Sequence, residues 1–514
     1  MKHTSRVNSC ALVGLDTVIV DVETDFFPGT HKFNIVGLPD AAIKESQQRV
    51  GSALKNSGAI PPYRLGVVIV NLAPADLRKV GVFYDLPIAV VVLAASAQVP
   101  HNLPLLKNSL FVGELALNGD LRAVKGILPI ALSAKNAGFE NLFIPEVNAS
   151  ETSIIKGIKV YPVKNLEQLM LFFKGELAIV PFNPSKKIDT RPAYFFDMKD
   201  ICGQEHVKRA MEIVAAGGHN VCLIGPPGSG KTLIARTFPS ILPEMGLEEC
   251  LETTKIFSVA GKLDSSKPLI RERPFRSPHH TASNIALIGG GTNPRPGEIS
   301  LSHRGVLFLD EFLEFPAKTL DCLRQPLEDG IVTISRAARS VTFPARFILV
   351  AAMNPCPCGY ATDLEKECTC SPGVVTRYQK KLSGPICDRI DIFVNVPRIK
   401  HNKLTVEEKR ESSLLVRKRV QAARNIQNSR FKNDKLFSNA EMSNQHIKLH
   451  CQYDEKTKLI LVEAIRKFHL SARSYYRTLK IARTIADLES SPELKIAHVA
   501  EALQYRFQGE ILIN

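Results

Sequence analysis

Short apolar runs bounded by turn residues recur along most of the chain, and helical patterns lie between them. Runs of this length are typical of buried strands in an α/β sheet. In the central region they predict strands at 221–224, 305–311 and 346–353, and toward the N-terminus at 17–22, 65–72 and 109–117. Helices are predicted at 40–57, which follows Pro39 and ends before Gly58, and at 86–97.

The C-terminal region differs, because its apolar residues recur at helical spacing. In 471–488, for example, Leu479, Ile481 and Ile485 share a helix with several arginines. The segment PFNPSKKIDTRPA, at 181–193, is rich in proline and charge and is typical of a linker. We therefore predict a mixed α/β domain at 1–180, a linker at 181–199, an α/β core at 200–400 and a helical domain at 401–514.

A glycine-rich turn carries the strongest chemical signal. It fills the template G-x-x-x-x-G-K-[ST] between a predicted strand and a predicted helix. In such a turn backbone N–H groups wrap a polyphosphate, the lysine meets the β- and γ-phosphates, and the hydroxyl binds Mg²⁺. The helix N-terminus adds partial positive charge. We therefore expect ATP and Mg²⁺ at Gly225, Pro226, Pro227, Gly228, Ser229, Gly230, Lys231 and Thr232.

Two further strands are predicted to complete this site. The run GVLFLDE ends in Asp310 and Glu311, as a parallel strand ends at the ligand-binding edge of a sheet. Asp310 would hold Mg²⁺ through water, and Glu311 would polarise the attacking water, because phosphoryl transfer needs both a metal and a group that orients the nucleophile. The run RFILVAAM ends at Asn354, which either contacts the γ-phosphate or lytic water or caps the turn before Pro355.

Together with the glycine-rich turn, four segments resemble the magnesium-chelatase-like AAA+ ATPases. They are GVLFLDE, AAMNPCPCGY, SGPICDRIDIFV and SARSYYRTLKIARTIADL. The chain is similar to the ComM/YifB branch of that family over nearly its whole length. The resemblance implies a P-loop AAA+ core, a C-terminal α-helical lid and a homo-oligomeric ring, expected to be a hexamer. It also implies that Gly203 and Gln204 lie near the adenine.

The same resemblance assigns roles to arginines. Arg389 resembles the finger that one subunit supplies to the γ-phosphate of its neighbour, a contact worth ~10³–10⁵ in rate. The alternative is that Arg389 bridges Asp388 and Asp391 within one subunit. On the lid, Arg473, or else Arg477, resembles the second sensor of the family.

The N-terminal region resembles the proteolytic domain of Lon-type proteases, an α+β fold like that of ribosomal S5 domain 2. The resemblance rests on VGELALNGDLRAV and GFENLFIPEVNA. The Lon pattern has a nucleophilic serine where this chain has Asp85, and a lysine where it has Leu-Pro-Ile at 128–130; Lys125 and Lys135 are out of register. A Ser-Lys dyad needs a desolvated lysine beside the serine. We therefore expect a scaffold or binding module without peptidase activity.

Two other segments are candidates for contact with nucleic acid. A predicted insertion at 251–299 carries Arg276, His279 and His280. Adjacent histidines point apart on a regular element, which favours a phosphate- or DNA-facing loop over a metal site, although a structural role fits equally well. A predicted hairpin within 327–345 carries Arg336 and Arg339 at its tip, and the family resemblance places such tips near the ring axis. A solvent-exposed basic turn is the alternative for the hairpin.

Four cysteines follow Asn354 in the pattern C-P-C-x9-C-T-C. Two close pairs joined by turns have the number and compactness of a tetrahedral structural zinc site, although C-x-C is tighter than the usual C-x2-C. The alternative is a group of small buried thiols. Four thiolates leave no open position, so any Zn²⁺ would be structural. The candidate ligands are Cys356, Cys358, Cys368 and Cys370.

Composition narrows the partners further. The chain has 66 Lys and Arg against 51 Asp and Glu, a net charge of +15, which suits DNA as a partner, although a generally basic surface explains it as well. The apolar run at 86–97 is too short to span a bilayer. With a polar N-terminus and eleven cysteines, this predicts a cytoplasmic protein with reduced or metal-bound thiols and no membrane contact.

These features predict an ATP-hydrolysing ring motor that acts on single-stranded or branched DNA. The resemblance implies a ComM-like helicase that promotes branch migration while incoming DNA is integrated during natural transformation. The alternative is a chelatase-like or protein-remodelling AAA+ ATPase with no DNA substrate. A protease is disfavoured because the Ser-Lys pair is missing.

Overall fold

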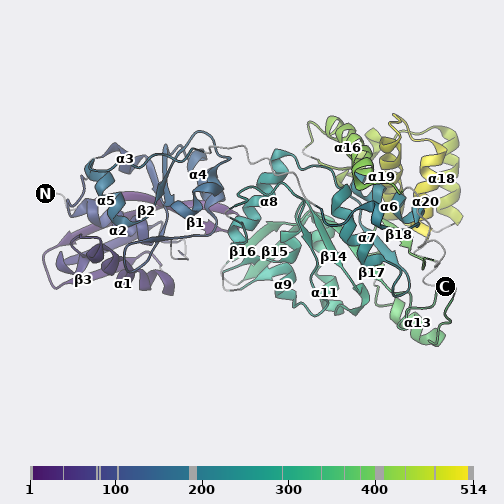
Figure 1. The fold of residues 1–514 in the computed structure, drawn as a ribbon, viewed down its shortest axis with the longest axis horizontal. Helices are drawn as coiled ribbons and strands as arrows, with labels where there is room; N and C mark the ends of the chain where they lie inside the picture. Colours follow the sequence, from purple (N-terminus) through teal and green to yellow (C-terminus); the bar gives the residue numbers. More distant parts are fainter. Residues whose placement is uncertain are drawn as a thin grey trace.

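The computed structural model describes residues 4–507, apart from the segments 77–78, 101–102, 184–193, 337–338, 400–409 and 468–469 and the positions 39, 80, 82, 265, 292, 364, 383 and 435. Figure 1 shows an elongated molecule with an N-terminal α/β domain at one end, an α/β core in the middle and a helical domain against the far side of the core. None of its described helices is long and apolar enough to cross a membrane.

The N-terminal domain is built on a seven-stranded mixed sheet. Its strands, in spatial order, are β3 (Lys32–Val36), β4 (Val67–Ala73), β2 (Asp16–Phe27), β1 (Ser5–Val13), β5 (Ser109–Phe111), β8 (Asn141–Pro145) and β9 (Lys159–Val163). A separate small hairpin pairs β6 (Glu114–Leu115) with β7 (Leu121–Arg122). The helices are α1 (Ala41–Asn56), α2 (Asp85–Ala95), α3 (Pro104–Lys107), α4 (Ile127–Asn136) and α5 (Leu166–Lys174).

Two sequence predictions in this domain need correction. The strand predicted at 109–117 is broken, because β5 ends at Phe111 and β6 pairs elsewhere. The interruption has a local cause: Gly113 N–H donates to the carbonyl of Phe83, so the backbone leaves the sheet to meet the loop before α2. The strand predicted at 17–22 is the middle of the longer β2, and its partner β1 was not predicted.

The core contains a five-stranded parallel sheet. Its strands, in spatial order, are β11 (Phe275–Arg276), β14 (Val306–Leu309), β17 (Ile348–Met353), β10 (Val221–Ile224) and β18 (Ile392–Asn395). Strands β10 and β14 are buried along their whole length, as expected where both faces of a parallel sheet are covered. The helices of the core are α6 (Glu205–Gly217), α7 (Lys231–Thr237), α8 (Leu247–Ala260), α9 (Asn284–Ile288), α10 (Glu298–Leu301), α11 (Ala317–Asp321), α12 (Arg324–Asp329), α13 (Pro372–Gln379) and α14 (Gly384–Cys387).

Two short hairpins lie outside this sheet. One pairs β12 (Gly289–Gly290) with β13 (Arg295–Pro296), and the other pairs β15 (Ile331–Arg336) with β16 (Arg339–Pro344). The segment predicted as an insertion at 251–299 is only partly one, because α8 begins before it and β11 is the edge strand of the core sheet. The prediction missed β11 because a two-residue strand leaves almost no periodicity.

The C-terminal domain is helical, as predicted. It consists of α16 (Ser413–Arg430), α17 (Asn444–His450), α18 (Glu455–Lys467), α19 (Ala472–Leu488) and α20 (Ile496–Phe507). Helices α16 and α19 pack on α6, and their apolar residues form one cluster with one face of the core sheet. The predicted α/β core with a helical lid is therefore confirmed.

The N-terminal domain contacts the core through α4 and α8, which lie side by side in Figure 1. Gly126 N–H donates to the carbonyl of Ser258 at 3.1 Å, and the hydroxyl of Ser258 donates to Glu151 at 2.9 Å. The β1–β2 turn reaches further, since Leu15 packs in the apolar cluster that includes β15 and β16. Within the described residues, the N-terminal domain therefore contacts the core both at α4 and at the β1–β2 turn.

Candidate nucleotide site

The glycine-rich turn connects β10 to α7, which begins at Lys231. Gly230 precedes the helix with φ +91°, a left-handed conformation that L side chains rarely adopt. At Gly225 a Cβ atom would lie 2.1 Å from the carbonyl oxygen of Val396, so only glycine fits beside that strand end. The turn therefore packs against the backbone at Gly225. At Gly230 it is open, because a Cβ atom there would meet nothing within 4 Å.

Lys231 points back over this turn. Its Nζ donates to the carbonyls of Gly225 at 2.7 Å and Pro226 at 2.9 Å, and to Oδ1 of Asn354 at 3.2 Å. Burial lowers the pKa of Lys231 to about 8, and the nearby charge of Asp310 only partly opposes this shift. A buried ammonium with neutral partners at the start of a helix suits an anionic ligand, so the residues present fit a nucleotide phosphate.

Thr232 and Asp310 lie together at the ends of their elements. Thr232 Oγ1 donates to Oδ2 of Asp310 at 2.8 Å, where α7 begins and β14 ends. A hydroxyl and a carboxylate are hard oxygen donors of the kind that Mg²⁺ prefers. This pair therefore fits the predicted magnesium site. Glu311 follows with φ +51°, an unusual conformation for a side-chain-bearing residue and one that turns the chain sharply out of the strand.

Two more predicted residues lie at this edge of the sheet. Asn354 follows β17, the strand between β14 and β10, and reaches Lys231. Gln204 lies against the turn, since its Nε2 donates to the carbonyls of Ser229 at 3.0 Å and Pro397 at 2.9 Å. The structure thus brings together residues from four separate segments of the chain.

The two adjacent histidines lie in an irregular segment after β11, as expected for a loop. Their ring centroids are 4.1 Å apart, so the rule that neighbouring side chains point apart on a regular element does not apply to them. His280 Nδ1 is 3.3 Å from Oε2 of Glu311, the predicted base. Residue spacing could not reveal this contact, since the two side chains meet only when β11 and β14 pair.

Comparisons with known proteins agree with this geometry. The family model described as magnesium chelatase, subunit ChlI, matches residues 197–404, and two related models match 22–148 and 410–506. Competence protein ComM of Haemophilus influenzae is 42% identical over 511 residues, which cover 98% of each chain. The chain belongs to the magnesium-chelatase-like AAA+ ATPases of the ComM/YifB branch.

Two other relatives show how the similarity is distributed in this family. YifB of Escherichia coli is 41% identical, with 99% of this chain and 98% of YifB covered. Magnesium-chelatase subunit ChlI of Euglena gracilis is 23% identical, with 48% of this chain and 75% of that protein covered. The full-length architecture is therefore shared with the ComM and YifB proteins.

Arg389 lies at the edge of the sheet opposite to the phosphate turn of this AAA+ core. It precedes β18, which runs parallel to β10, whereas the turn follows β10. Its guanidinium donates to Glu328, to the carbonyl of Arg324 at 3.1 Å and to the carbonyl of Pro385 at 2.6 Å. Asp391 pairs with Arg477 instead, so the alternative in which Arg389 bridges the flanking aspartates is wrong.

The two lid arginines have different environments. Arg473 is exposed and its Nη2 is 3.2 Å from Oε1 of Glu328. Arg477 is half-buried and pairs with the fully buried Asp391. Burial opposes ionisation of Asp391, but the charge of Arg477 and hydrogen bonds from His219 and the Asn220 amide hold its pKa below the usual range. Neither arginine lies at the phosphate turn of its own subunit.

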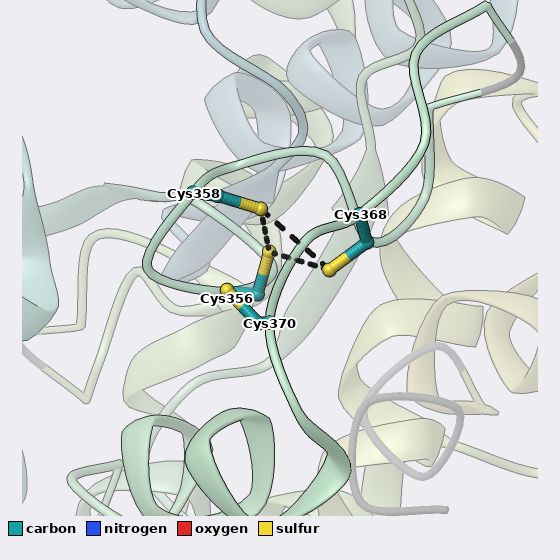
Figure 2. A group of neighbouring side chains, drawn as sticks. All are labelled: Cys356, Cys358, Cys368 and Cys370. Atoms are coloured by element: carbon teal, nitrogen blue, oxygen red, sulfur yellow. Dashed lines mark hydrogen bonds between the residues drawn. The ribbon is translucent and has the colours of Figure 1, made fainter.

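The four predicted zinc ligands converge on one point (Figure 2). The Sγ atom of Cys356 lies 3.3 Å from that of Cys358 and 3.7 Å from that of Cys368. The Sγ atoms of Cys358 and Cys368 are 3.6 Å apart. Around a tetrahedral Zn²⁺ with Zn–S bonds of about 2.3 Å, sulfur atoms lie about 3.8 Å apart. Hydrogen bonds from the backbone amide of Tyr360, first of all, and from Thr369 and the neighbouring thiols lower the pKa of Cys358 to about 6. The residues therefore fit a structural zinc ion.

The structure describes the side chain of one of the three candidate DNA-contact arginines. Arg276 pairs with Glu298, whose Oε1 accepts from its Nη2 at 2.8 Å. Arg336 is opposite Arg339 at the last backbone pair of the β15–β16 hairpin. The side chains of these two hairpin residues, and residues 337–338 between them, lie outside the described part of the structure.

Asp85, which the Lon resemblance predicted to stand in place of the serine, is fully buried at the start of α2. Its carboxylate accepts from Arg49 Nε at 2.8 Å and from the amide of Leu115 at 3.2 Å. Burial raises the pKa of Asp85 in spite of these donors. The Leu-Pro-Ile sequence at 128–130 is buried in α4, and Lys125 lies against Gly261 of the core. These residues support the structure of the domain.

Proposed function

We propose that the chain is one subunit of an ATP-hydrolysing ring, expected to be a hexamer, that moves on single-stranded or branched DNA. The proposal includes a ComM-like helicase role in branch migration while incoming DNA is integrated. The main support for assembly into a ring is the position of Arg389. It lies on the opposite edge of the sheet from the phosphate turn that precedes Lys231. An arginine so placed reaches a γ-phosphate only when a second subunit presents one.

In this proposal the side chains divide the chemistry of one site. Lys231 and the amides of the turn bind the β- and γ-phosphates, and Glu311 orients the attacking water and accepts its proton. Asn354, which is within reach of Lys231, orients the γ-phosphate or the water. Bound Mg²⁺ neutralises phosphate charge, and Thr232 and Asp310 would hold it. Arg389 of the neighbour stabilises the charge that spreads over the transferred phosphoryl group.

DNA as the substrate is supported by three observations. The net charge is +15, the hairpin carries Arg336 and Arg339 at its tip, and the full-length relative from Haemophilus influenzae is a competence protein. Arginine forks bind phosphate oxygens in a bidentate manner without reading sequence. A motor that moves along DNA of any sequence needs contacts of this kind.

The test is the ATPase rate of the full-length protein with no DNA and with single-stranded, duplex or branched DNA. We expect DNA to raise the rate, and Glu311→Gln or Arg389→Ala to reduce it by about a hundredfold or more, since each removes a transition-state contact. Arg336→Ala with Arg339→Ala should abolish the stimulation and keep the basal rate. A basal rate that no DNA changes would reject the DNA motor and favour the chelatase-like or protein-remodelling alternative.

We also propose that Zn²⁺ occupies the cluster of Cys356, Cys358, Cys368 and Cys370. The sulfur spacing supports it, because three of the four atoms already lie at separations close to those of a tetrahedral site. The ion would fix the loop that follows Asn354 and so support the edge of the nucleotide site.

A further inference from the structure

The carboxylate of Glu328 binds two arginines from different domains. It lies on α12 and is about half exposed. Oε2 accepts from Nη2 of Arg389, which precedes β18 in the core, and Oε1 lies 3.2 Å from Nη2 of Arg473, which lies in the first turn of α19 in the lid. The partners are 61 and 145 residues away in sequence, so the carboxylate gathers both guanidinium groups at one place.

The whole guanidinium group of Arg389 is engaged by its own subunit. Nη2 donates to Glu328, Nε to the carbonyl of Arg324 and Nη1 to the carbonyl of Pro385. Two of these acceptors, Arg324 and Glu328, belong to α12. Arg389 therefore cannot bind a phosphate with its fork unless it first leaves α12.

Helix α12 leads directly into the hairpin. It ends at Asp329, Gly330 follows with φ +68°, and β15 begins at Ile331. A single residue thus separates the helix that Arg389 holds from the hairpin that carries Arg336 and Arg339. If the contacts between Arg389 and α12 break, the change in α12 therefore takes place at the base of that hairpin.

We propose that Glu328 is a competing counter-ion for Arg389 and Arg473, and that the triphosphate of the neighbouring subunit draws both arginines away from it. Release of α12 then frees the hairpin, so that nucleotide binding in one subunit changes the DNA contact of the next. This inference rests on the proposed ring ATPase. Charge-assisted bonds to a polyphosphate outcompete a half-exposed ion pair, which is why the exchange goes in this direction. Glu328 is in this sense a positioning residue.

The test compares Glu328→Gln with Asp329→Asn in the full-length protein. Asp329 is the next carboxylate on the same helix, is exposed, and has no ion pair with any residue that the structure describes. Removing the competitor should raise the basal ATPase rate about two- to fivefold, the size expected for a partly exposed pair. The ratio of DNA-stimulated to basal rate should fall toward one, while Asp329→Asn should behave as wild type.

Two further arms make the result decisive. The rise must disappear in Glu328→Gln combined with Arg389→Ala, and Glu328→Ser must raise the basal rate as Glu328→Gln does. Unchanged rates, or a basal and a stimulated rate that fall in the same proportion, would overturn the inference. If wild-type protein hydrolyses ATP but DNA never stimulates it, the DNA-motor proposal fails, whereas the basal rates of the variants still test Glu328.

Discussion

At the scale of single residues, the buried charges distinguish the two lid arginines. Asp391 is fully buried and its carboxylate pairs with Arg477, whereas Arg473 pairs with a half-exposed glutamate on the surface. The first ion pair supports the junction between lid and core. The second leaves Arg473 available to an incoming phosphate.

This difference predicts unequal effects on stability. Arg477→Ala leaves the buried Asp391 without its arginine and should lower the free energy of unfolding by about 3 kcal/mol or more. Arg473→Ala removes an exposed pair and should cost less than about 1 kcal/mol. Denaturant unfolding of the two full-length variants, followed by a probe of lid helicity, measures both. If both variants lost the same free energy of unfolding, Arg477 would contribute no more to stability than Arg473 does.

At the scale of elements, the segment that joins β17 to α13 carries the four cysteines between two parts of the core. Its first two cysteines follow Asn354 closely, so a metal ion there would limit the movement of that residue. The remaining pair precedes α13. The cluster thus connects the nucleotide edge of the sheet to the helix that projects from the core (Figure 1).

We predict about one equivalent of zinc in the purified protein and none in a variant with Cys356→Ser and Cys358→Ser. Loss of a structural site removes the cross-link that holds the segment, so the melting temperature should fall as well. Elemental analysis measures the metal, and Cys322→Ser, which changes a thiol outside the cluster, is the matched control. Equal zinc in wild type and the double variant would exclude this site.

At the scale of the whole molecule, the junction between the N-terminal domain and the core contains an unusual buried acid. Glu151 accepts from Asn148 at 2.7 Å, from Ser258 of the core at 2.9 Å and from the backbone amide of Leu128, without a cation among the described residues around it. Burial raises its pKa. The folded protein therefore disfavours the charged form of Glu151 relative to the unfolded chain.

The sign of the pH effect follows from this shift. Because the folded pKa is raised, stability is complete below the ordinary glutamate pKa of 4.5 and falls as the pH rises from there through the folded value. Glu151→Gln removes the charge, while its carbonyl oxygen can still accept from Asn148 and its NH₂ can donate to the hydroxyl of Ser258. The substitution should raise the melting temperature by about 2–4 °C at pH 8 and by less at pH 5. Glu146→Gln, an exposed change on the same 3-10 helix, is the control. A gain that is equal at both pH values would contradict the explanation.

The sequence by itself determined the class of fold and the composition of the phosphate site. The glycine-rich turn, the strand that ends in Asp310 and the strand that ends before Asn354 are local patterns, and the sheet brings them to one edge because its strands are parallel. The helical lid was predictable for the same reason, since amphipathic periodicity needs no distant partner. Family resemblance added the full-length architecture.

Only the tertiary structure decided which side chains meet across distant segments. The contact of His280 with Glu311, the pairing of Arg477 with Asp391 and the convergence of Arg389 and Arg473 on Glu328 join residues that no local pattern relates. The break after β5 was missed because a hydrogen bond to another segment defines it, and the edge strand β11 was missed because two residues leave almost no periodicity. Ion pairs depend on where a folded backbone brings charged groups, and residue spacing along the chain does not contain that information.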